Sequence, residues 1–235
     1  MNILFLLPLL FIILLGAALP TVSARDNVPF EEDFSEGIGS ECLVQVHNAI
    51  TENDPVQLKQ LLQKYAKNSC INEIIPDNSG QTLIMHAVLT GKTAEIVSLL
   101  LDHGADVTIG EYMGYTPIHG AGFQGRAELA KLLVQKANMN VMDRHKDDGF
   151  TPLHRACWGS QPRHTETVQV LLELGADPDD EMCMKRPVSS RTNGEQQQYY
   201  EECRHLIETT QNPETVKVLK AFTKLDKYKI KQDEL

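Results

Sequence analysis

Three stretches of the chain repeat one another, and this self-similarity limits the possible folds more than any other feature of the sequence. Thr82, Thr116 and Thr151 mark equivalent points in the three copies, and they lie 34 and 35 residues apart. Each copy continues into a second apolar segment that begins at a glutamate, namely Glu95, Glu128 or Glu166. A fixed period of this length is typical of solenoids, in which each unit buries its apolar face only against its neighbours.

The repeated residues resemble the ankyrin repeat, which has a turn and two antiparallel helices, with Thr-Pro-Leu-His-x-Ala at the start of the first helix. This chain has Thr-Pro-Ile-His-Gly-Ala at 116–121 and Thr-Pro-Leu-His-Arg-Ala at 151–156. Degenerate copies lie on both sides, around residues 42–65 and 214–219. The resemblance implies an all-α repeat solenoid over residues 40–224, with about five ankyrin-like helix-turn-helix repeats and degenerate terminal ones.

The local chemistry of the repeats supports helix pairs independently. Thr116 and Thr151 are expected to cap helices through their hydroxyls, because a proline follows each of them at the first helical position. Gly104 follows its helix where a left-handed residue is favoured. In the next unit Lys136 is expected at that place, at a cost of about 1 kcal/mol if the conformation is kept.

The two ends of the chain look like cellular addresses. Residues 1–24 contain no charged side chain and are predicted to be a secretory signal peptide, followed by an acidic flexible segment over 25–39. A basic tail over 225–235 ends in Gln232, Asp233, Glu234 and Leu235, which resembles the tetrapeptide bound by the retrieval receptor of the endoplasmic reticulum. We therefore predict a lumenal protein without stable membrane insertion after cleavage. The alternatives are a secreted protein and one anchored by an uncleaved signal.

The five cysteines are an odd number, so they cannot all pair within one chain. In an oxidising lumen Cys42 with Cys70, or Cys183 with Cys203, are possible structural bridges. Cys157 lies at a small-residue helix position and is expected to be a buried thiol. The sequence has no CxxC motif, and we predict no cofactor, metal or catalytic site. The formal charge of −10 disfavours nucleic acid as a partner.

A polar excursion interrupts the fifth unit at about residues 181–198, and long loops are often functional or disordered. An alternative function, a lumenal enzyme or redox helper, would use the 181–210 segment with Cys183, Cys203 and His205. The acidic run that precedes it, residues 177–181, lacks the spacing of a calcium loop and is interpreted as a solvated turn.

His119 and His154 occupy the histidine position of the motif. We expect each ring to form hydrogen bonds within its own turn and to the adjacent repeat, since repetition explains both residues without any catalytic chemistry.

Large apolar residues recur at positions that face the concave side of an ankyrin-like stack. The residue two after the motif alanine is Leu89, Phe123 or Trp158 in successive units, and the residue before the motif threonine is Gln81, Tyr115 or Phe150. Tyr112 and Met113 belong to the same turn as Tyr115. Exposed aromatic residues in a column are typical of interfaces. The sequence therefore predicts a non-catalytic protein-interaction module with an unidentified protein partner. The alternative is that the loops around Asp147 and Pro162 bury these side chains.

Overall fold

The computed structural model describes residues 40–67, 69–76, 79–187 and 199–228. The predicted signal peptide, the acidic segment and the retention signal all lie outside the described residues. Within them, no helix is both long enough and apolar enough to cross a bilayer.

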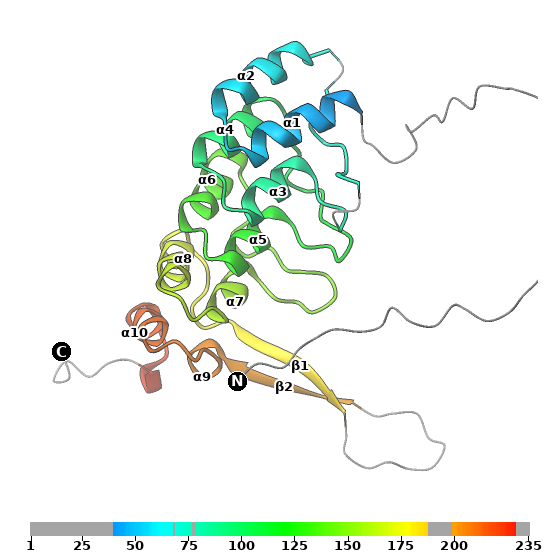
Figure 1. Cartoon of the computed structure of the whole chain (residues 1–235). Helices are drawn as coiled ribbons and strands as arrows, with labels where there is room; N and C mark the ends of the chain where they lie inside the picture. Colours follow the sequence, from blue (N-terminus) through cyan, green and yellow to red (C-terminus); the bar gives the residue numbers. More distant parts are fainter. Residues whose placement is uncertain (1–39, 68, 77–78, 188–198, 229–235) are drawn as a thin grey trace, which may run out of the picture. The chain divides into compact units, whose positions relative to one another are not determined.

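The described helices form five pairs, in agreement with the predicted repeat solenoid (Figure 1). In chain order the pairs are α1 Glu41–Thr51 with α2 Pro55–Lys64, α3 Leu83–Leu89 with α4 Ala94–Asp102, α5 Pro117–Gln124 with α6 Ala127–Ala137, α7 Pro152–Cys157 with α8 Pro162–Glu173, and α9 Leu206–Thr209 with α10 Pro213–Phe222. The first helices of the pairs pack on one another in an inner layer, and the second helices stack in an outer layer. A short 3-10 helix, Asp226–Tyr228, follows the last pair.

The core lies between these two layers. Ile84, Leu100, Ile118, Leu133 and Leu153 are fully buried, and they come alternately from inner and outer helices. No single helix pair encloses its own apolar stripe, so each repeat is stabilised by its neighbours.

Two of the four predictions about helix ends are confirmed, and two are wrong. Thr151 caps α7 together with His154, and Gly104 is left-handed with φ 88°. The Thr116 hydroxyl does not cap the backbone of α5, because it contacts the His119 ring instead. Lys136 is not left-handed either: α6 continues past it, and Asn138 takes the left-handed conformation with φ 54°. Asn tolerates that conformation better than Lys, so the cost expected at Lys136 does not arise.

The polar excursion in the fifth unit was predicted to be a loop, but it has a β-strand at each end, and the two strands pair as a hairpin. Strand β1, Glu181–Pro187, pairs antiparallel with β2, Tyr199–His205. Cys183 lies opposite Cys203 in this register, and the two form a disulfide. A covalent bond between facing strands holds together a pair that would be marginal alone in water.

Both suggested disulfides are present. Cys42 in α1 is bonded to Cys70, which ties the first helix to the turn before the second repeat. Cys157, at the end of α7, is a free and buried thiol as predicted. Burial raises its pKa far above the usual range of a thiol, so the reactive thiolate is suppressed.

Candidate partner-binding groove

A groove opens between the inner helices α3 and α5 and the turns that precede them. Its volume is about 380 Å³. Apolar and aromatic side chains provide most of its surface, together with a few polar groups, and the lining residues are Ser79, Gln81, Met85, Leu89, Glu111, Met113, Tyr115, His119, Gly120, Phe123 and Arg155. We call this the aromatic groove. It combines Leu89, Met113, Tyr115 and Phe123, four of the seven residues predicted to contact a partner.

Gly120 leaves room for the groove. His86, Gly120 and Arg155 occupy the same position of the repeat motif, so Gly120 is the member of this row that has no side chain. A Cβ atom at Gly120 would lie 3.1 Å from Leu89 Cδ2 and 3.5 Å from Met85 Cε. Any larger side chain would therefore occupy space that is now open between Leu89 and Phe123.

Arg155 forms one end of the groove, and it was not among the residues predicted from the sequence to contact a partner. Its guanidinium donates to the Tyr115 hydroxyl at 2.6 Å and pairs with Asp148. The same group lies 4.5 Å from the centre of the Tyr115 ring and 4.6 Å from that of Trp158. Only 7% of Arg155 is exposed. These contacts fix two aromatic side chains from different repeats in place.

The lengthened turn before the fourth repeat supplies a second support for the groove. His145 stacks on Tyr115 with ring centres 3.9 Å apart, and its Nε2 atom lies 2.6 Å from the Met113 carbonyl oxygen. Tyr115 is therefore held between His145 and Arg155. Burial, followed by the nearby Asp148 carboxylate, raises the pKa of Tyr115, so its hydroxyl keeps its proton.

The predicted contact residues differ in exposure. Tyr112 is 79% exposed, Met113 62%, Phe123 54% and Trp158 44%. Phe150 is buried, and its ring packs edge-on against Trp158 with centres 5.3 Å apart. Phe150 thus supports the Trp158 ring. The long loops around Asp147 and Pro162 do not bury the four exposed side chains, Tyr112, Met113, Phe123 and Trp158.

Comparison with known proteins decides the family. The family model of ankyrin repeats (three copies) matches residues 46–145 and 128–182, more than half of the chain. The chain belongs to the ankyrin-repeat family. Ankyrin repeats indicate protein–protein interaction, and protein partners are implied for this member as well.

Individual relatives of this ankyrin-repeat protein match over part of their length. Tyrosine-protein kinase HTK16 from Hydra vulgaris is 31% identical over 133 residues, which are 56% of this chain and 17% of the kinase. Inactive serine/threonine-protein kinase TEX14 from Bos taurus is 29% identical over 133 residues, 56% of this chain and 8% of that protein. Alpha-latrotoxin-Lg1a from Latrodectus geometricus is 34% identical over 110 residues, 46% and 8% of the two chains. The chain spans less than a fifth of each relative.

The motif histidines of the ankyrin repeats form the predicted contacts within their own turns, but only His119 also forms the predicted hydrogen bond to the adjacent repeat, because the Nε2 atom of His154 has no hydrogen-bond partner among the described residues. The Nδ1 atom of His119 lies 2.9 Å from the Thr116 hydroxyl, and its Nε2 atom lies 3.2 Å from the Phe150 carbonyl oxygen in the next repeat. The Nδ1 atom of His154 lies 2.6 Å from the Thr151 hydroxyl. Burial lowers the pKa of both rings, so they stay neutral at pH 7.

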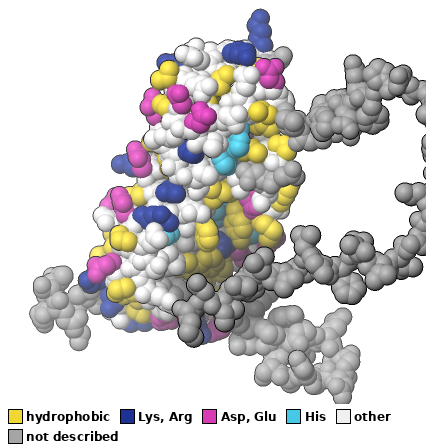
Figure 2. Space-filling model, viewed as in Figure 1, with side chains coloured by type: hydrophobic (Ala, Val, Ile, Leu, Met, Phe, Trp, Pro, Cys, Tyr) yellow, Lys and Arg dark blue, Asp and Glu magenta, His cyan; other side chains and the backbone are white. Residues whose placement is uncertain are grey.

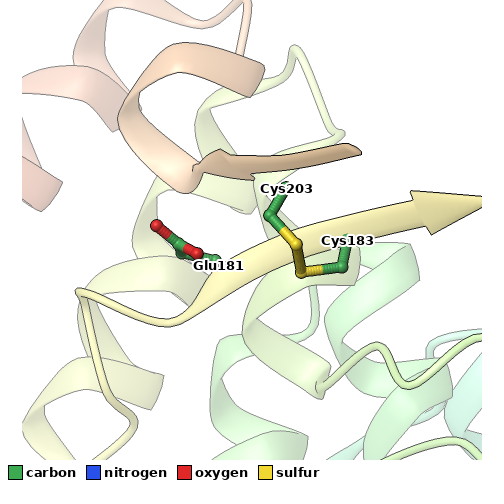
Figure 3. Close-up of side chains that lie close together, drawn as sticks. All are labelled: Glu181, Cys183 and Cys203. Atoms are coloured by element: carbon green, nitrogen blue, oxygen red, sulfur yellow. A yellow bond between two sulfur atoms is a disulfide. The ribbon is translucent and has the colours of Figure 1, made fainter. Parts of the chain in front are cut away.

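Within the described residues of the 181–210 segment, the alternative site, one cluster of side chains could supply metal ligands. Glu181, Cys183 and Cys203 have ligand atoms within 4.8 Å of one another (Figure 3). Both sulfur atoms are joined in the disulfide, so neither provides the thiolate that a metal or a nucleophilic reaction requires. His205 does not join this cluster, because its Nε2 atom lies 3.3 Å from Asp179 Oδ1.

The acidic run before the hairpin is not a solvated turn. Asp179 accepts hydrogen bonds from Thr223 and from the Lys224 backbone, and Asp180 forms a two-bond ion pair with Arg144. Burial opposes ionisation of Asp179, but these hydrogen bonds outweigh it and lower the pKa of Asp179. The run therefore joins the fourth repeat to the last helix pair.

Proposed function

We propose that this chain is a non-catalytic protein-interaction module, retained in the lumen of the endoplasmic reticulum, that holds a partner through the aromatic groove. The observation that carries the proposal is an apolar groove lined by the solvent-exposed Phe123, with the exposed Trp158 packed on Arg155 at one end. Large apolar side chains exposed together are typical of interfaces, and aromatic residues dominate the binding free energy at many of them.

The groove has the size and character of a site for one or two large side chains of a partner. Its volume lies near the lower end of the range of small-molecule sites. The exposed Tyr112, next to the lining residue Met113, extends the apolar surface beyond the groove along the preceding turn. A partner segment that inserts an anchor side chain at Gly120 can therefore also lie against this turn.

The lumenal location rests on three features that agree. Residues 1–24 resemble a signal peptide, Gln232–Leu235 resemble a retrieval signal, and two disulfides form among the described residues. Disulfides persist in secretory compartments and are rare in the cytosol.

Proximity labelling inside the lumen tests the binding function. A labelling enzyme fused to the chain is compared in three forms: the unchanged chain, the double variant F123A/W158A, and V56A as a control. Val56 is 66% exposed on the outer helix α2, away from the groove. We expect F123A/W158A to lose specific labelled proteins that the other two forms share, with little change in melting temperature. If all three forms label the same proteins, the groove does not hold the partner.

A further inference from the structure

A row of cationic side chains lies beside the aromatic groove, in the loops that join inner to outer helices. Lys92 lies between α3 and α4, Arg126 between α5 and α6, and Arg163 at the start of α8. Successive repeats thus each place one cation at the connection between their two helices. In Figure 2, dark-blue Lys and Arg side chains on the left of the repeat stack are interspersed with magenta Asp and Glu side chains.

The two arginines are held by the same kind of contact. The left-handed Gly91 has φ 68°, and a Cβ atom there would lie 2.2 Å from Arg126 Cζ. Gly125 is also left-handed, with φ 65°, and a Cβ atom there would lie 2.8 Å from Arg163 Cγ. Each arginine therefore packs on the glycine of the preceding loop, which fixes its side chain without neutralising its charge.

The charges of these arginines are not compensated within the described part of the chain. No carboxylate of a described residue lies within 4 Å of the guanidinium of Arg126 or Arg163, whereas Arg144, Arg155 and Arg204 each have such a partner. The Nε atom of Arg126 is buried and finds no hydrogen-bond acceptor among these residues. Burial, followed by the charge of Arg163, lowers the pKa of Arg126. Two like charges held close together favour an anion beside them.

The cationic row adjoins the groove through the helices themselves. Leu89 lines the groove and precedes Gly91 by two residues, and Phe123 has the same relation to Gly125. Two acidic groups next to the groove already have partners within the chain: Glu111 accepts from the Met113 and Tyr115 backbone, and Asp148 pairs with Arg155. The exposed Glu95, Glu128 and Glu166 follow the three cations on the outer helices. Beside the groove itself, Arg126 and Arg163 offer positive charge to a partner, although the chain as a whole carries −10.

We propose that the partner of the groove is a protein segment in which a bulky apolar side chain is flanked by carboxylates. The apolar side chain enters the aromatic groove above Gly120, and the neighbouring Asp or Glu side chains bind Arg126 and Arg163. Guanidinium groups suit this role because they can form two parallel hydrogen bonds to one carboxylate. This inference rests on the proposed function, since it assigns the chemistry of the segment held in the same groove.

Selection of peptides on the purified full-length chain tests the proposal. The probe is a phage library of random 12-residue peptides, and selection is carried out in parallel on the unchanged chain, on R126E/R163E, on F123S and on K131E. Lys131 is an exposed cation on the outer helix α6 and serves as the matched charge control. The winning peptides are then synthesised, and their affinities are measured by fluorescence anisotropy at 0.05 and 0.5 M NaCl.

We expect peptides that combine an aromatic or large aliphatic residue with nearby Asp or Glu. Their binding should weaken about tenfold or more in R126E/R163E and at high salt, and should be unchanged in K131E. The charge-reversed R126E/R163E chain should instead select peptides with Lys or Arg beside the apolar anchor, a gain that misfolding cannot imitate.

Two results separate failure of this inference from failure of the proposed function. The acidic partner would be overturned if the unchanged chain selected neutral or basic peptides, or if R126E/R163E left the affinities unaltered. In that case, loss of binding in F123S would still support the groove as the binding site. No enrichment of any peptide, or enrichment that survives F123S, would count against both.

Discussion

At the scale of single residues, two glycines in the same helix have opposite roles. Gly120 faces the open groove, whereas Gly122 faces α7, where a Cβ atom would lie 2.3 Å from the Pro152 carbonyl oxygen. A backbone oxygen cannot rotate away as a side chain can. Gly122 therefore allows two inner helices to approach closely, and Gly120 keeps a binding surface open.

Exchanging each glycine for alanine should separate these roles. G122A is expected to destabilise the protein by about 1–3 kcal/mol, because relieving the clash requires α5 and α7 to move apart. G120A meets only the flexible ends of Leu89 and Met85 and gains helix propensity, so its free energy of unfolding should stay within about 1 kcal/mol of the unchanged chain. Urea unfolding followed by circular dichroism measures both values. Equal stabilities of the two variants would show that the close approach at Gly122 is not needed.

Residue roles that depend on the repeat motif were predictable, and those that cross between repeats were not. His119 and His154 could be assigned because the motif gives each a partner three residues earlier, and His119 also has one in the neighbouring repeat. Arg155 stands at the variable position of the motif, and its partner Tyr115 is 40 residues away. His145 belongs to an inserted turn that no other repeat contains. Contacts of this kind depend on how two repeats stack, which a single sequence does not reveal.

At the scale of elements, the two disulfides secure different structures. Cys42–Cys70 closes a separation of 28 residues and ties α1 to the turn before the second repeat, whereas Cys183–Cys203 lies within the hairpin. A loop of about this length stabilises a protein by roughly 3 kcal/mol when its ends are crosslinked.

We expect C42A/C70A to lower the stability of the first helix pair by about 3 kcal/mol, because the terminal repeat has a neighbour on one side only. C183A/C203A should increase amide hydrogen exchange in β1 and β2 while leaving α3 to α6 protected. Hydrogen exchange with mass spectrometry distinguishes the two outcomes.

Alkylation of the unfolded, unreduced chain should label one thiol, Cys157, and labelling of more than one would contradict the pairing.

The hairpin was missed for a reason that lies in its composition. Its strands contain several charged residues, and eleven residues separate them, so no short turn signal marks a hairpin. The helix pairs were predictable because their apolar stripes and turn glycines recur three times. A hairpin that occurs once and is held by a disulfide leaves no comparable pattern.

At the scale of the whole molecule, neutral histidines make stability depend on pH. Burial, the neighbouring His47 and Lys92 lower the pKa of His86 to about 4, and burial lowers those of His119 and His154. In the unfolded chain these rings take up protons near pH 6.5. Between that pH and about 4 the unfolded state therefore binds more protons, so stability must fall as the pH falls through this range.

Urea unfolding at pH 7.5 and pH 5 measures this effect. The free energy of unfolding should be lower at pH 5, and H86Q, which removes one of the titrating rings, should show a smaller difference between the two pH values. A protein equally stable at both would contradict the assignment of neutral histidines in the folded state.

We propose that the last four residues determine the location of the molecule. Deleting 232–235 should move the chain from the cell to the culture medium, because the retrieval receptor no longer recognises it. Immunoblots of cell and medium fractions measure the change, and a chain with the four residues scrambled serves as a second test. Equal retention with and without Gln232–Leu235 would exclude them as the signal.

The contacts of Arg155 affect the kinetics and the specificity of partner binding. Its contacts with Tyr115, Asp148 and Trp158 keep the end of the groove in one arrangement before anything binds. The loss of conformational entropy on association then falls almost entirely on the incoming segment. Binding should resemble rigid docking onto a preformed surface, and differences in affinity among related partners should appear as differences in residence time.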